Sequence, residues 1–118
     1  MTKIKIDAQY AETLDMFARM GLSRLSRENN ALRENEKYDM AVFHSIYEKY
    51  ERFLREELAV WELSPIEVRY LLNEIKLAKF ERETEGDLPE EVAGIADEEL
   101  NELCVYLKKK LESTEEEA

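Results

Sequence analysis

The sequence predicts an all-α protein: a compact bundle of four main helices, with room for a short extra helix and an N-terminal extended arm. Three observations support this prediction. The 118 residues include three glycines and two prolines, too few for the many turns of a β-sandwich or barrel. Hydrophobic residues make up 44% and charged residues 38%, a balance typical of compact helical proteins. Apolar residues recur at intervals of three and four, the spacing of one helix face.

The N-terminal third is predicted to contain an extended segment followed by a helix. Lys3–Ile6 alternates charged and apolar residues, which favours a short strand or arm. Asp7 is a suitable N-cap for a helix that begins at Ala8. Its apolar face consists of Tyr10, Leu14, Phe17, Gly21 and Leu25. We expect Gly21 to end or bend this helix, and the Asn29-Asn30 pair to mark a break.

The second and third helices meet at the clearest local signal in the chain. The second is predicted from about Glu36 to Trp61. Its apolar stripe consists of Val42, Ile46, Tyr50, Phe53, Leu54, Leu58 and Trp61. In Ser64-Pro65-Ile66-Glu67, serine can cap a helix, proline fits its first position and glutamate can reach back to the cap. The third helix is therefore predicted from Pro65 to about Phe80.

The third helix has two apolar flanks. One consists of Val68, Leu71, Leu72 and Ile75, and the other of Ile66, Tyr70, Leu77 and Phe80. An apolar arc this wide predicts contacts with more than one neighbour. We therefore expect this helix to be central in the bundle, or to dock one side onto another subunit in a homodimer.

The last third is predicted to contain a charged loop and a final helix. Glu81–Asp87 is the loop, Pro89 can open a short helix, and Asp97 can cap the last one. The buried face of that helix consists of Leu100, Leu103, Cys104, Leu107 and Leu111. We expect residues 1–113 to form one domain and residues 114–118 a frayed acidic tail.

Charge is distributed unevenly along the chain. Residues 81–118 carry fourteen acids and four bases, a net charge of 4 − 14 = −10, whereas the whole chain carries −11. Such a charge repels nucleic acids and anionic membranes at long range. In contrast, the stretch from Met16 to Arg27 holds three arginines and no acid. These residues, Arg19, Arg24 and Arg27, form a local cationic patch.

Features that would indicate catalysis or export are missing from the sequence. The only histidine, His44, is expected to be structural, and the only cysteine, Cys104, to be a core residue. One cysteine excludes an internal disulfide, and no apolar run reaches the ~20 residues of a membrane span. We therefore expect a cytoplasmic protein without metal, cofactor or membrane contact.

Three functions are compatible with these patterns. The favoured one is a non-catalytic protein–protein interaction module, which includes an acidic inhibitor or regulator from a mobile element that binds a basic partner surface. Its expected contact residues are Arg19, Arg24, Arg27, Tyr38, Tyr47 and Tyr106, because exposed aromatic residues are enriched at interfaces. The second is a magnesium-dependent, all-helical nucleotide pyrophosphatase-like enzyme using Glu48, Glu51, Glu99 and Glu102. The third is a DNA-binding regulator that uses the arginine-rich segment 19–33, although we do not favour nucleic acid as a partner.

Overall fold

The computed structural model of the chain describes residues 3–27, 34–57, 60–84 and 90–117. Four long helices dominate it, and the predicted all-α class is confirmed. The elements in chain order are β1 (Ile4–Ile6), α1 (Ala8–Arg27), α2 (Glu34–Leu54), β2 (Trp61–Leu63), α3 (Pro65–Glu83), α4 (Glu90–Ala93) and α5 (Asp97–Glu117). Within the described ranges, no helix is long and apolar enough to cross a membrane.

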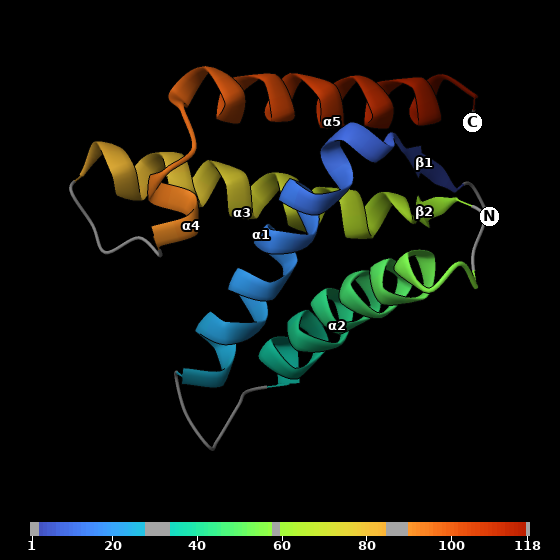
Figure 1. Cartoon of the computed structure of the whole chain (residues 1–118), viewed down its shortest axis with the longest axis horizontal. Helices are drawn as coiled ribbons and strands as arrows, with labels where there is room; N and C mark the ends of the chain where they lie inside the picture. The colour runs from blue at the N-terminus through green and yellow to red at the C-terminus, as the bar shows by residue number, and fades with distance from the viewer. Residues whose placement is uncertain (1–2, 28–33, 58–59, 85–89, 118) are drawn as a thin grey trace.

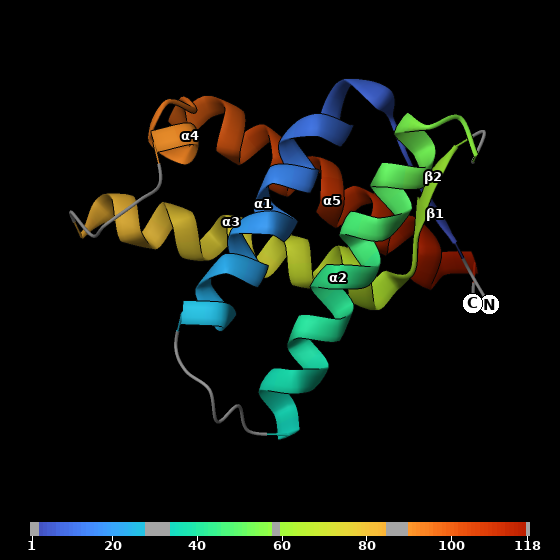
Figure 2. The same cartoon turned by 60° about the horizontal axis from the view of Figure 1, so that its bottom comes forward.

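The helices form two antiparallel pairs. α1 packs along α2, and α3 packs along α5, as both views show (Figures 1 and 2). α3 also contacts α1 and α2, so it joins the two pairs. The predicted N-terminal strand is confirmed as β1, which pairs antiparallel with β2 and places Ile4 opposite Leu63 and Ile6 opposite Trp61. This two-stranded sheet connects the start of α1 to the start of α3.

The core receives side chains from both helix pairs and from the sheet. The largest fully buried side chains include Trp61, Phe17, Leu14, Ile46, Leu63, Leu71, Ile75, Leu100, Leu103 and Leu107. Three of these belong to α5, so the acidic third of the chain is part of the folded core rather than a separable tail. α5 reaches Glu117, and fraying of its last turn in solution stays a prediction.

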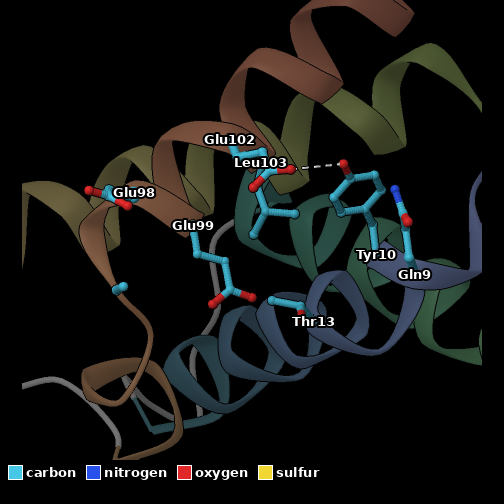
Figure 3. Close-up of a pocket in the computed structure, with 8 residues that line it drawn as sticks. Gln9, Tyr10, Thr13, Glu98, Glu99, Glu102 and Leu103 are labelled. Atoms are coloured by element: carbon cyan, nitrogen blue, oxygen red, sulfur yellow. Dashed lines mark hydrogen bonds between the residues drawn. The ribbon is translucent and has the colours of Figure 1, made fainter.

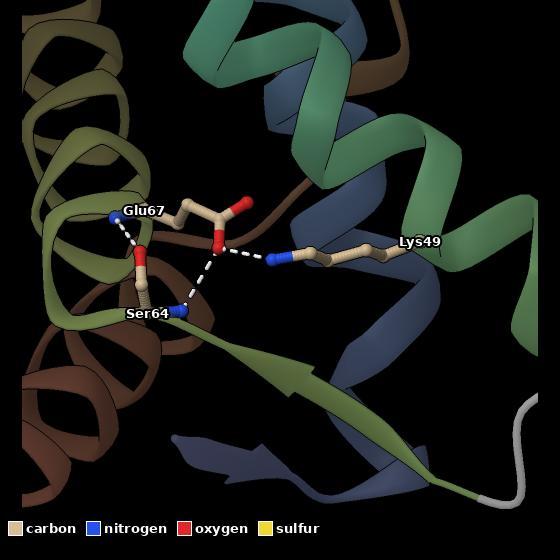
Figure 4. Close-up of polar contacts among 3 residues, drawn as sticks. All are labelled: Lys49, Ser64 and Glu67. Atoms are coloured by element: carbon tan, nitrogen blue, oxygen red, sulfur yellow. Dashed lines mark hydrogen bonds and ion pairs between the residues drawn. The ribbon is translucent and has the colours of Figure 1, made fainter. Parts of the chain in front are cut away.

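The start of α3 at Pro65 is confirmed, together with its capping box (Figure 4). The Ser64 hydroxyl accepts a hydrogen bond from the Glu67 amide at 3.2 Å, and the Glu67 carboxylate accepts one from the Ser64 amide at 2.9 Å. Two of the backbone donors that a helix start leaves open are satisfied in this way. α3 continues to Glu83, into the segment predicted as a loop; residues 85–87 of that segment lie outside the described ranges.

The predicted end of the second helix at Trp61 is wrong, because α2 ends at Leu54 and Trp61 lies in β2. A Schellman motif closes α2: the Glu57 amide donates to the Arg52 carbonyl, and the Glu56 amide to the Phe53 carbonyl. Glu56 has φ = 62°, the left-handed conformation that glycine usually supplies at this position. Because glutamate instead of glycine stands here, the sequence lacks the usual signal for the end of a helix.

The predicted break at Gly21 is also wrong, because α1 runs through it without interruption. A β-carbon placed on Gly21 would lie 2.8 Å from the ring of Phe43 on α2. That ring is buried and makes an edge contact with Tyr70, with centroids 5.5 Å apart, so it has little room to move. Gly21 therefore permits close approach of α1 and α2 rather than a bend in the chain.

The left-handed residue that closes α2 gives a testable prediction. Glu56→Gly should stabilise the protein by about 0.5–1 kcal/mol, because glycine adopts this conformation without steric cost and the exposed Glu56 side chain contributes no described contact. Urea unfolding measures the change. Glu57→Gly is the control and should lower stability, because it makes the unfolded chain more flexible without relieving strain and also removes the exposed ion pair with Arg52. Equal effects of the two substitutions would contradict the prediction.

Candidate protein-binding face

One side of α3 carries large apolar side chains that stay exposed in the described part of the structure. Three of them are exposed: Ile66 at 46%, Leu77 at 36% and Phe80 at 59%. With half-buried Tyr70 and exposed Asn73, they follow one another at intervals of four and three residues and so lie along one helix face. We call Ile66, Tyr70, Asn73, Leu77 and Phe80 the α3 stripe. The opposite flank, with Val68, Leu71 and Ile75, is fully buried.

Two buried carboxylates set the direction in which the α3 stripe points. Glu67 and Glu74 are 5% and 4% exposed and lie seven residues apart on one side of α3. Glu67 accepts a hydrogen bond from Lys49 of α2 at 2.6 Å, and Glu74 pairs with Arg24 of α1 (Figure 4 shows the former). Burial raises the pKa of Glu74, and Arg24 opposes that rise. With this side of α3 held against α1 and α2, and α5 packed on the helix as well, the stripe faces solvent.

Tyrosines extend the apolar surface from the stripe toward α2. Tyr38, 54% exposed at the start of α2, makes an edge contact with Tyr70 at a centroid distance of 6.4 Å. The Tyr70 hydroxyl donates a 2.7 Å hydrogen bond to Asp39. Burial and this bond raise the pKa of Tyr70 to about 12, so it remains a neutral donor at physiological pH. Tyr38 therefore adds an exposed aromatic ring beside a Tyr70 ring that is held in place.

Both bases and acids border the stripe, because Asp39 contacts Tyr70 and exposed Glu83 lies seven residues after Lys76 on the same side of α3. Arg69 and Lys76 are exposed and, seven residues apart, occupy the same side of the helix. From Pro65 to Phe80 the acids of α3 are Glu67 and Glu74, and both are buried in ion pairs.

The predicted arginine patch is largely engaged within the fold. Arg24 pairs with Glu74, fifty residues away in the chain. Arg19 lies 2.9 Å from the carboxylate of Asp15, which is fully buried although the Arg19 side chain is 57% exposed. Arg27 ends α1, and its side chain lies outside the described part of the structure. The expectation of a patch without nearby acids therefore does not hold for Arg19 and Arg24.

The three predicted tyrosines have different environments. Tyr38 borders the α3 stripe, as described above, and Tyr47 is half-buried on α2. Tyr106 stabilises the fold. Its hydroxyl accepts a hydrogen bond from the Asp7 amide and donates one to the Asp7 carboxylate, both at 2.9 Å, and its ring packs on Tyr10. Burial raises the pKa of Tyr106 to about 12. Leu77 and Phe80 were not among the predicted contact residues, although the second apolar flank of the helix is their sequence signal.

A pocket of about 470 Å³ lies between the first turns of α1 and α5 (Figure 3). Glu99 and Glu102 line it, with Tyr10 donating a 3.2 Å hydrogen bond to Glu102. Glu48 and Glu51, the other two acids of the pyrophosphatase hypothesis, are on α2 and do not line this pocket. Among the described residues, no group of three or more His, Cys, Asp or Glu side chains is placed to hold a metal ion. The structure thus does not gather these four acids into one site.

His44 and Cys104, the two other residues considered for chemistry, lie on different helices. His44 is exposed on α2, with its Nδ1 atom 3.9 Å from a carboxylate oxygen of exposed Glu48. Cys104 is buried on α5 among the leucines of the core, as predicted. Neither residue lines the pocket between α1 and α5.

The buried Asp15 predicts a pH-dependent stability. Burial raises its pKa from 3.8 to about 6, against the opposing effect of Arg19. Between pH 3.8 and about 6, Asp15 is protonated in the native protein but ionised in the unfolded chain. The stability that comes from protonated Asp15 is therefore lost as the pH rises through about 6. Asp15→Asn should therefore stabilise the protein by roughly 2 kcal/mol at pH 7 and by little at pH 4.

Urea unfolding at the two pH values checks this prediction. Glu12→Gln, at an exposed acid one turn earlier on α1, is the matched control and should show no such difference. Comparing each variant with the wild type isolates Asp15 from other titrating groups. A gain from Asp15→Asn that is equal at pH 4 and pH 7 would refute the raised pKa.

The exposed apolar face of α3 is the strongest candidate site in the described structure. Its evidence is physical: exposed apolar side chains along one helix face and a fixed helix orientation. Comparisons with models of protein families, with curated proteins and with solved structures find no match for this chain.

Proposed function

We propose that this chain is a non-catalytic interaction module that binds a protein partner through the α3 stripe. The exposure of Ile66, Leu77 and Phe80 along one helix face is the observation that supports this proposal. Single exposed apolar residues are ordinary, whereas an aligned set of large ones marks an interaction surface. An aromatic residue such as Phe80 is well suited to anchor a partner, because burying it removes a large apolar area from water.

A second copy of the chain is one partner that the sequence predicts, and the homodimer stays a prediction. The other possible partner is a different protein. A cytoplasmic location also stays a prediction. Neither the pyrophosphatase nor the DNA-binding hypothesis gains support from the described residues, because their acids are not gathered and Arg19 and Arg24 pair with Asp15 and Glu74.

A variant of the module uses the acidic surface of α5 to bind a basic partner, as an inhibitor or regulator would. Glu98, Glu99 and Glu102 are exposed on the first turns of α5 and support this second candidate. Removal of the acidic third cannot test it, because α5 fills the core. Replacing these three glutamates with glutamine keeps the core intact. The acidic variant predicts weaker and less salt-dependent partner binding after this change.

Substitution on the stripe tests the main proposal. Phe80→Ser should reduce recovery of a specific partner by at least about fivefold when tagged protein is used as bait in an extract of its source cells, because interface aromatic residues often contribute more than ~1 kcal/mol. The matched control is Val105→Ser on α5, which removes another exposed apolar side chain, 50% accessible, away from the stripe. Circular dichroism verifies that both variants fold. Equal recovery by Phe80→Ser and Val105→Ser would reject the proposal.

A further inference from the structure

We draw no further inference here: the strongest candidate, the exposed apolar face of α3 that carries Ile66, Leu77 and Phe80, belongs to the site already described, and nothing in the described part of the structure shows what covers it.

Discussion

The pairing of Glu67 with Lys49 and of Glu74 with Arg24 fixes how α3 is rotated about its own axis. In each pair the carboxylate is buried and the cation is more than a third exposed, so removing the cation would leave a buried carboxylate without compensation. A turn of α3 large enough to bury Phe80 would separate both pairs and expose Val68 and Ile75. The capping box adds a third constraint, because the same Glu67 carboxylate holds the first turn of the helix. The direction of the stripe is therefore a consequence of these buried charges.

Buried and exposed acids have different consequences in this chain. Glu67, Glu74 and Asp15 are enclosed by the fold, and each lies against a cation: Lys49, Arg24 and Arg19, respectively. The exposed acids of α5 remain in water and give that helix its negative surface. Net charge therefore describes long-range repulsion but not the position of each acid, because three of the 28 acids are enclosed by the fold.

Local signals made most of the fold predictable, whereas tertiary contacts account for the errors. The Ser64–Glu67 capping box and the two apolar flanks of α3 depend on residues within a few turns, so the sequence contains them in full. Glu56 closes α2 in a conformation that usually requires glycine, and Trp61 was therefore assigned to a helix instead of β2. The role of Gly21 depends on Phe43 in another helix. Arg24 was predicted as a partner contact because Glu74, its actual neighbour, is fifty residues away.

The exposed side chains of the α3 stripe contribute little to the stability of the folded chain. Phe80 retains 59% of its exposure, so its ring gains little of the burial that stabilises Phe17 or Trp61. A polar residue at this position would satisfy the fold equally well and would lower the tendency to aggregate. Large apolar residues that the fold does not need, aligned on one face of α3, therefore support the proposed interaction surface.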